Sequence, residues 1–466
     1  MRHHECQPHR VTKPIRQQLR VAVLGLGLAA ACVAAQQPRS ASPGSGAILL
    51  QNVQLFDPTS GTFTDTVDIL IRGDRIASVG KLAPPGRGVT HLDARGKFAL
   101  PGLWDSHVHF SFLTLGGDTA VAATLAAFVR HGITSVRDVG GPLDTIAGLS
   151  RRVALGAMLG PRIYFAGPLL SRAPLLRSAE NEVLPGTSVA VESPAGVDSM
   201  LDRLVERGAS MTKAIDRWDP TLFRYYIRAA RARSLPVVWD PGLAILNPIP
   251  IDTALALGVA SIEHAKAAWS GVLRGDLRPE VDSVIAAIMA GEETYASQEA
   301  VLLRLMALGE QSVSPERLTV LADTWAKSGA YFSPTMHTAV DNLAGATPEL
   351  HRPYGGLLAA SWMFVRELAA HGVKLLVGQD GIDPDGALRE MDLLASAGVS
   401  PVEILRGATV YPARWLGVDS IVGTLEPGKR ADILILESNP LERITNIRSV
   451  WAVVHDGRIV SGPPVK

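Results

Sequence analysis

Short apolar runs with alternating polar positions lie near both ends of this chain. They occur at residues 48–56, 67–79 and 89–93, and again at 431–436 and 449–460. A period of two puts the apolar side chains of a strand on one face, so these runs predict half-buried strands. Gly73-Asp74 supplies a hairpin turn within the second run. We therefore expect a small β-sandwich domain formed by both chain ends.

The region between these ends alternates strand-like apolar runs with helical stretches. The runs lie at residues 98–109, 135–139, 162–167, 211–215, 237–240, 260–264, 330–335 and 374–380. Eight strands joined by helices are the number that closes a (β/α)8 barrel. Glycines expected at helix C-termini precede several runs: Gly132, Gly208, Gly258, Gly329 and Gly372. The predicted fold is α/β, a (β/α)8 TIM barrel with the small sheet domain attached.

The first residues have the pattern of an export signal. Residues 1–20 are polar and basic, and residues 21–35 carry no charge and end in Val33-Ala34-Ala35. This pattern is typical of a secretory signal peptide, and the apolar run is short for a membrane span. The protein is therefore expected to be exported, either periplasmic or secreted. Cys32 lies in an imperfect lipoprotein box, so a lipid anchor stays open, as does an uncleaved membrane anchor.

These patterns give an expected domain organisation. It consists of a signal peptide at 1–35, a Pro/Gly/Ser-rich linker at 36–47, a first β-sandwich part at 48–98, the barrel at 99–417 and a second β-sandwich part at 418–466. Both cysteines, Cys6 and Cys32, lie in the leader, so the mature domains are expected to contain no disulfide.

The charge balance limits the expected partners. Lys plus Arg and Asp plus Glu each number 45, and the sequence pI is about 7.2. This balance gives no electrostatic case for nucleic acid binding and favours a small-molecule substrate. Membrane contact is expected only through the leader or a lipid anchor, and the sequence is compatible with a homo-oligomer.

The residues His107-Val108-His109 are the main sign of chemistry. Histidines at i and i+2 of an extended segment point to one side, so both imidazoles can face one metal ion. Barrel enzymes place their chemistry at the C-terminal ends of the strands. In this chain, six residues with metal-binding or proton-transfer side chains lie in or at the ends of the expected strands. Each of them alone has an ordinary explanation as a core histidine, a cap or a solvated lysine, but together they predict a metal site. The candidates are His107, His109, Lys213, Asp240, His264 and Asp380.

Several segments resemble the amidohydrolase superfamily, with the imidazolonepropionase-like and prolidase-like branch the most similar. The resemblance extends over residues 48–462 and is carried by residues 101–109, 132–138, 261–264, 378–380, 423–432 and 439–440. It implies that the protein binds one or two divalent metal ions, with zinc as the expected metal. In that scheme His107, His109 and Asp380 hold the more buried ion. Lys213, carboxylated by CO2 when two ions are bound, bridges them, and His264 holds the second.

The fifth strand departs from the family pattern. Asp240 stands where the family has a histidine. A carboxylate can bind zinc through oxygen, so the second position is retained in altered form, lost, or filled by a harder ion. After the third strand, Ser171-Arg172 replaces the Gly-Gly-His of many relatives.

The resemblance implies metal-assisted hydrolysis of a C–N amide bond in a dipeptide, an N-acyl amino acid or a cyclic amide. Asp380 would accept the proton of the attacking water and pass it to the leaving amine. Hydrolysis of an ester, lactone or carbamate is the alternative reaction, and a metal-poor barrel acting as a binding protein is the alternative class.

Substrate contacts are less well defined by the sequence. A bidentate arginine can hold a substrate carboxylate, although a solvated loop arginine is the ordinary alternative for each candidate. The candidates are Arg137, Arg172, Arg177 and Arg217. His337 either lines the pocket or is a loop histidine without a role.

Overall fold

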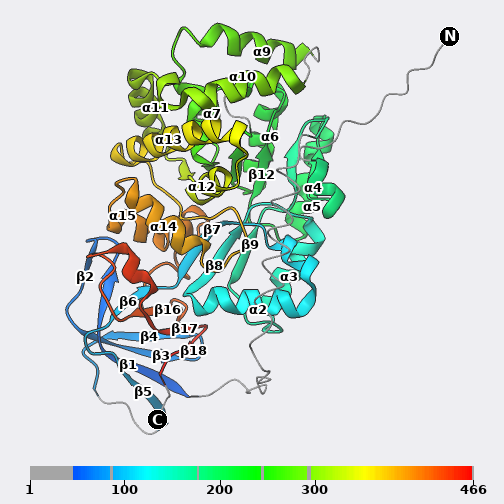
Figure 1. The fold of residues 1–466 in the computed structure, drawn as a ribbon. Coiled ribbons are helices and arrows are strands. Elements are labelled where there is room, and N and C mark those ends of the chain that lie inside the picture. The colour runs from blue at the N-terminus through cyan, green and yellow to red at the C-terminus, as the bar shows by residue number, and fades with distance from the viewer. Residues whose placement is uncertain (1–45, 84–87, 176–177, 243–245, 291–294, 464–466) are drawn as a thin grey trace, which may run out of the picture.

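The computed structural model describes residues 46–83, 88–175, 178–242, 246–290 and 295–463 (Figure 1). The leader expected at residues 1–35, including Cys32, and Arg177 lie outside the described residues.

Both ends of the chain contribute to one nine-stranded sheet, as the sequence predicts (Figure 1). Its strand order is β18-β17-β16-β6-β1-β3-β4, with β2 and β5 also paired to β1. The strands are β1 (Ala47–Asp57), β2 (Thr62–Phe63), β3 (Val67–Arg72), β4 (Arg75–Gly80), β5 (Val89–Asp93), β6 (Phe98–Pro101), β16 (Ile433–Leu436), β17 (Val450–His455) and β18 (Arg458–Ser461). The hairpin expected at Gly73-Asp74 joins β3 to β4.

The alternating apolar positions of these strands form their own core. Ile69 and Ile71 of β3 pack with Ile433 and Ile435 of β16 and with Val454 of β17. These residues lie two apart along each strand, so one face of the sheet is apolar. Burial of this face holds the N- and C-terminal segments together.

The run expected as the first barrel strand is in fact two strands. Residues 98–101 form β6 of the nine-stranded sheet, and β7 (Leu103–Val108) pairs in parallel with β8 (Ile133–Asp138). The break falls at Gly102, where a Cβ atom would lie 2.0 Å from Oγ1 of Thr134. Only glycine permits this close approach, and it directs the chain from one sheet into the next.

The central strands are parallel and form two sheets. One has the order β7-β8-β9, and the other has the order β11-β10-β12-β13-β14-β15. The strands not yet introduced are β9 (Arg162–Phe165), β10 (Leu169–Ser171), β11 (Ser188–Ala190), β12 (Thr212–Ile215), β13 (Val237–Asp240), β14 (Ser261–Glu263) and β15 (Tyr331–Ser333). The short strands β10 and β11 were not expected from the sequence.

The run at 374–380 was expected as the eighth strand, but it forms only isolated bridges. Leu375 bridges Phe332 of β15, and Gly381 bridges Val108 of β7, both in parallel. The Asp380 amide donates a 2.8 Å hydrogen bond to the His107 carbonyl. This segment therefore lies between the last strand of one parallel sheet and the first strand of the other.

Helices follow the parallel strands in the α/β manner expected. They are α2 (Gly117–Arg130), α3 (Leu143–Ala154), α4 (Ser178–Val183), α5 (Pro194–Glu206), α6 (Pro220–Ala232), α7 (Ile251–Leu257), α8 (Trp269–Val272), α9 (Arg278–Ala290), α10 (Tyr295–Leu308), α11 (Pro315–Ser328), α12 (Met336–Ala344), α13 (Pro348–Ala370), α14 (Gly386–Ser396), α15 (Pro401–Gly407) and α16 (Val410–Trp415). The glycines expected near helix C-termini all have positive φ: Gly132, Gly208, Gly258, Gly329 and Gly372.

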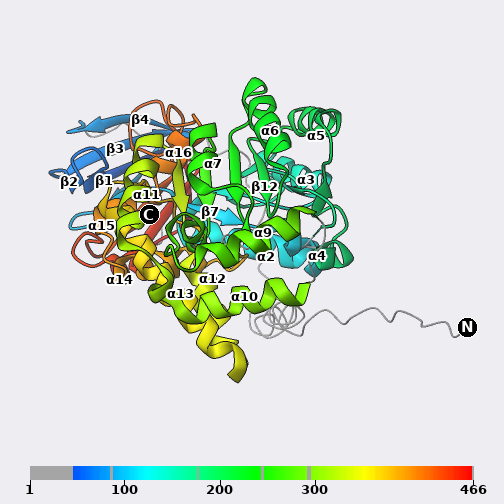
Figure 2. The same ribbon diagram turned by 90° about the horizontal axis from the view of Figure 1, so that it is seen from above.

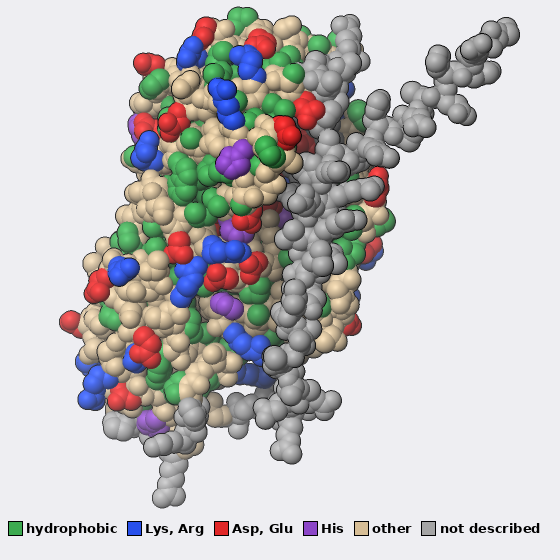
Figure 3. Space-filling view, in the orientation of Figure 1, with side chains coloured by type: hydrophobic (Ala, Val, Ile, Leu, Met, Phe, Trp, Pro, Cys, Tyr) green, Lys and Arg blue, Asp and Glu red, His purple; other side chains and the backbone are tan. Residues whose placement is uncertain are grey.

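The helices and the nine-stranded sheet occupy different parts of the molecule. Seen from above, β1 to β4 lie at one side and α5 and α6 at the other (Figure 2). The helices α9 and α10 lie at the end remote from the sheet, where α10 packs on α13 and α9 packs on α10 (Figure 1). Acidic and basic side chains are intermixed over the face drawn in Figure 3.

Candidate metal centre

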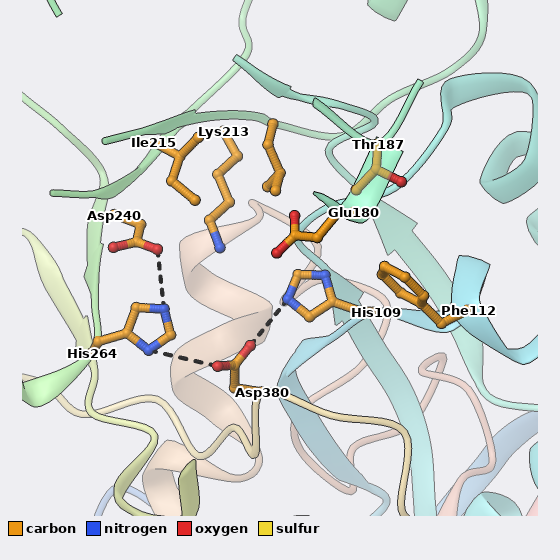
Figure 4. Close-up of a pocket in the computed structure, with 10 residues that line it drawn as sticks. His109, Phe112, Glu180, Thr187, Lys213, Ile215, Asp240, His264 and Asp380 are labelled. Carbon is orange, nitrogen blue, oxygen red and sulfur yellow. Dashed lines mark hydrogen bonds and ion pairs between the residues drawn. The ribbon is translucent and has the colours of Figure 1, made fainter. Parts of the chain in front are cut away.

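A pocket of about 100 Å³ lies at the C-terminal ends of the parallel strands (Figure 4). Five of the six site residues predicted from the sequence line it: His109, Lys213, Asp240, His264 and Asp380. The sixth, His107, is fully buried beside them. The remaining lining residues are Phe112, Leu169, Glu180, Thr187 and Ile215. The structure thus brings together residues that lie up to 273 positions apart, from His107 to Asp380.

His107, His109 and Asp380 form the most compact group of potential metal ligands in the described part of the chain. Each offers a ligand atom, and these atoms lie within 4.8 Å of one another. Oδ1 of Asp380 is 3.3 Å from Nε2 of His107 and 3.1 Å from Nε2 of His109. This is the trio that the family resemblance assigns to the buried ion.

The outward nitrogens of the histidines are held by the protein. Nδ1 of His107 lies 2.8 Å from Oε2 of Glu263, and Nδ1 of His109 lies 2.9 Å from the Gly140 carbonyl oxygen. A carbonyl oxygen only accepts, so Nδ1 of His109 donates the hydrogen. In a neutral His109, Nε2 then carries the lone pair, and this atom faces Asp380.

The chemistry of this donor set fits a cation. When both histidines are neutral with Nδ1 as the donor, their Nε2 lone pairs and the Asp380 carboxylate oxygen face one another without a hydrogen between them. Such converging acceptors require a proton or a metal ion. Two imidazoles and one carboxylate, each held by a second group, are also the usual ligand types for zinc.

The titration behaviour of the trio reflects this close arrangement. Burial and the charge of Lys213 lower the pKa of His107 to about 4. Burial also opposes protonation of His109, but the hydrogen bond to Asp380 and the charges of Asp380 and Asp138 together outweigh burial and raise the pKa of His109. Burial raises the pKa of Asp380, yet the interactions with His107 and His264 and the hydrogen bonds with His107 and His109 together outweigh burial and hold that pKa well below its usual value. Asp380 is therefore a carboxylate at neutral pH.

Lys213, Asp240 and His264 form the other half of the pocket. Lys213 Nζ lies 3.4 Å from His107 Nε2. Asp240 Oδ2 lies 3.2 Å from His264 Nε2 (Figure 4). β12 and β13 pair so that Ile215 is opposite Asp240, which places Asp240 at the strand end. Asp240 Oδ1 accepts a 2.8 Å hydrogen bond from the Gly242 amide, and this bond orients the carboxylate.

The segment after β15 supports two of the pocket residues. Thr335 Oγ1 lies 2.7 Å from His264 Nδ1, and the Thr338 hydroxyl donates to Asp380 Oδ2 at 3.3 Å. Glu390 fixes the start of α12 by accepting hydrogen bonds from two backbone amides, and burial raises the pKa of Glu390 to about 8. Sequence reasoning missed these residues, because none lies in a motif with the ligands.

Arg137 is not available to a substrate, in contrast to its candidacy in the sequence. Its side chain is fully buried, and Nη2 donates to Oε1 and Oε2 of Glu263 at 2.8 and 2.7 Å.

The other candidates for substrate contact that the structure describes lie outside the pocket lining. The Arg172 guanidinium lies against the Met289 sulfur at 3.8 Å. Arg217 and His337 do not line the pocket either. The sequence analysis did not propose a role for Glu263 in the site. Its position directly before the candidate ligand His264 could have indicated that it lies near the metal centre.

Comparison with known proteins places the chain in a family. The amidohydrolase family model matches residues 98–218 and 283–460, which is more than half of the chain. Asp240 and His264 lie between the two matched segments. Ochratoxinase of Aspergillus niger is 24% identical over 418 residues, which cover 78% of this chain and 76% of that protein.

A second relative matches a shorter segment. The putative N-acetylgalactosamine-6-phosphate deacetylase of Escherichia coli K12 is 34% identical over 90 residues, 18% of this chain. The match spans half of the length of that relative.

Solved structures show the same fold at low sequence identity. A Xaa-Pro dipeptidase with methionine bound in its active site has a TM-score of 0.68 at 19% identity, covering 89% of this chain and 99% of its own. Phenylurea hydrolase B has a TM-score of 0.65 at 18% identity, covering 89% and 96%. Since the family model covers more than half of the chain, including His107, Lys213 and Asp380, this chain belongs to the amidohydrolase family, as its motifs predict.

Proposed function

We propose that this protein is a metal-dependent hydrolase that cleaves a C–N amide bond with activated water. The observation that carries the proposal is the convergence of Asp380 Oδ1 on the Nε2 atoms of His107 and His109, at 3.3 and 3.1 Å. Family membership supports the reaction class. The names of similar proteins, an ochratoxinase, a deacetylase and a Xaa-Pro dipeptidase, support an amide substrate.

In this proposal the parallel strands form a closed (β/α)8 barrel, with the nine-stranded sheet as a β-sandwich domain. Two isolated bridges support closure, since they link the 374–381 segment to β15 on one side and to β7 on the other. A closed barrel would fix the distances between residues that belong to different strands.

His107, His109 and Asp380 would hold the buried ion. Lys213, carboxylated when two ions are bound, His264 and Asp240 would hold a second. A divalent ion such as zinc supplies Lewis acidity there, lowering the pKa of water to roughly 7 and polarising the substrate carbonyl. Asp380 accepts the proton of the attacking water and delivers it to the leaving amine. Its carboxylate is suited to this role because it is ionised at neutral pH and lines the pocket.

Substrates of this pocket would be small amides: dipeptides, N-acyl amino acids or cyclic amides. Phe112, Leu169 and Ile215 give the pocket an apolar wall, which suits an uncharged side chain of the substrate. The leader pattern supports export to the periplasm or outside the cell.

A metal measurement combined with a substrate panel tests the proposal. Purified protein is analysed for bound metal and then assayed with dipeptides, N-acyl amino acids, lactams, esters and lactones. We expect bound divalent metal and amide hydrolysis that a chelator abolishes and zinc restores. Metal with faster ester, lactone or carbamate cleavage would favour the alternative reaction. Neither metal nor hydrolysis would favour a binding protein.

A further inference from the structure

Two fully buried charged residues lie beneath the pocket, and the proposed reaction does not use them. Glu263 ends β14 and Arg137 lies in β8, and each side chain has 0% exposure. Oε2 of Glu263 is 2.8 Å from Nδ1 of His107. Arg137 also donates to the Ser106 carbonyl oxygen at 2.6 Å and lies 4.7 Å from the Trp415 ring centre. The pair therefore connects β14, β8 and the residue preceding His107.

We infer that Glu263 and Arg137 are positioning residues that fix the His107 imidazole in the tautomer able to bind the buried ion. This inference rests on the proposed metal-dependent function. Neither residue contacts the pocket, so each acts through His107: Glu263 directly and Arg137 through Glu263.

The hydrogen-bond partners around Glu263 determine the tautomer. Arg137 has only donors, and its Nη2 reaches both oxygens of Glu263. The Ser261 hydroxyl accepts from Arg137 Nη1 at 2.9 Å and donates to Glu263 Oε1 at 2.7 Å. Both oxygens of Glu263 are thus acceptors, so Nδ1 of His107 must be the donor. Nε2 of neutral His107 then has a free lone pair directed at Asp380.

The three histidines in and beside the pocket are held by different kinds of hydrogen-bond partner. His107 is backed by a carboxylate, whereas a backbone carbonyl backs His109 and a hydroxyl backs His264. A carboxylate partner increases the basicity of an imidazole and restricts its rotation more strongly than a neutral one. His107 is therefore the most firmly fixed of the three, and the buried ion should exchange more slowly than an ion held by His264.

Arg137 makes this arrangement possible in a buried site. A lone buried carboxylate is strongly disfavoured, and an arginine that binds both oxygens compensates its charge and fixes its plane. A lysine at this position would keep the charge, but its single nitrogen could not replace the bonds that Nε and Nη1 of Arg137 make to the Ser106 carbonyl oxygen and the Ser261 hydroxyl. Arg137 should therefore influence metal binding without touching the ion.

The chain contains a matched control for this test. Asp432 is also buried, also accepts from a histidine Nδ1, that of His455 at 2.9 Å, and also pairs with an arginine, Arg162 at 2.5 Å. This second arrangement does not line the pocket. The same carboxylate-to-amide change can therefore be made in both places, as Glu263→Gln and Asp432→Asn.

The experiment measures zinc affinity by competition with a chromogenic chelator, and it follows the His107 Nδ1–H proton by NMR of histidine labelled with ¹⁵N. We expect Glu263→Gln to weaken the tighter zinc by about 10- to 100-fold and to shift or remove the downfield proton. Arg137→Lys should give a smaller loss in the same direction. Asp432→Asn should lower the melting temperature but leave both readouts unchanged.

Three outcomes would overturn the inference: unchanged zinc affinity in folded Glu263→Gln, an equal loss in Asp432→Asn, or a His107 proton on Nε2 in the zinc-free parent. If Glu263→Gln does not fold, the test rests on Arg137→Lys, and an unchanged zinc affinity in that variant would overturn the inference. A parent protein that binds no zinc would instead contradict the proposed function itself.

Discussion

Asp240 Oδ2 lies 3.2 Å from Nε2 of His264, at the ends of the neighbouring strands β13 and β14. Asp240 stands where the resemblance leads one to expect a histidine, so a carboxylate and an imidazole meet where two imidazoles are expected. An additional negative charge reduces the net positive charge of a two-metal site. It should therefore raise the pKa of water at that site and favour harder ions in the second position.

Replacing Asp240 tests this interpretation. Asp240→His should increase the zinc occupancy of the second position relative to manganese, because imidazole is the softer ligand. The acidic limb of the pH–rate profile should move to lower pH. Metal analysis after reconstitution with each ion provides the measurement, and Asp240→Asn is the control that keeps the size and removes the charge. Identical metal content and pH profile in Asp240→His would place Asp240 outside the coordination sphere.

Loss of one histidine of the buried trio should remove metal and activity together. His109→Ala leaves only two of the three closely spaced ligands, so the bound metal should fall and hydrolysis should cease. His107→Ala should do the same. His337→Ala is the control, because this half-buried histidine does not line the pocket. Normal metal content and normal turnover in the trio variants would contradict the assignment.

Asp380→Asn should separate proton transfer from folding. An amide cannot accept the proton of water at neutral pH, so the rate should fall by on the order of a hundredfold to ten-thousandfold while the fold persists. Circular dichroism and kcat provide the measurements. Thr338→Val removes the 3.3 Å contacts of this hydroxyl with Asp380 Oδ2 and with the Gln379 carbonyl oxygen but keeps the carboxylate, so it should cause a smaller loss. Full turnover in Asp380→Asn would require another base.

Lys213 should be carboxylated when two ions are bound. An ammonium group at this position would repel two divalent cations, whereas a carbamate can bridge them. Lys213→Ala should lose activity and regain part of it with acetate or propionate, and reconstitution of the parent should depend on bicarbonate. Lys213→Met, tested without added acid, is the inactive reference. A fully active parent with an unmodified lysine, shown by spectroscopy of ¹³C-labelled protein, would contradict this prediction.

Asp432 should contribute to stability in a pH-dependent way. Burial raises the pKa of its carboxyl, but the hydrogen bond from His455 and the charge of Arg162 outweigh burial and place the pKa below 3.8. The stabilisation is therefore complete above the unfolded-state value of 3.8 and is lost as the pH falls through the lower folded-state value.

At neutral pH, Asp432→Asn should lower the free energy of unfolding by about 3 kcal/mol, as expected when one partner of a buried pair is removed. Denaturant titrations between about pH 7 and pH 3 provide the measurement, and the difference from the parent should shrink at the acidic end. Asp74→Asn is the control, since the half-exposed Asp74–Arg430 pair should contribute less than about 1 kcal/mol. A difference independent of pH would exclude an electrostatic origin.

The local strand patterns and the family resemblance could be predicted from the amino-acid sequence alone. Alternation along 67–79 and 449–460 predicted the strands of the terminal sheet, because strand periodicity is a local property. The i, i+2 spacing placed His107 and His109 on one side, Asp380 closed the last apolar run, and the run at 211–215 carried Lys213. These interpretations depended on residues close in sequence, or on segments that resemble a known family.

Tertiary structure alone decided which distant groups meet. Glu263 lies 156 residues from His107 and 126 from Arg137, and the sequence contains no local signal that pairs them. The division of the first strand at Gly102 likewise depends on Thr134, which approaches from another strand. Parallel strands bring distant residues together through long crossover connections, and burial then selects the partners that satisfy each charge. The support behind the candidate metal ligands is therefore a property of the packed strands.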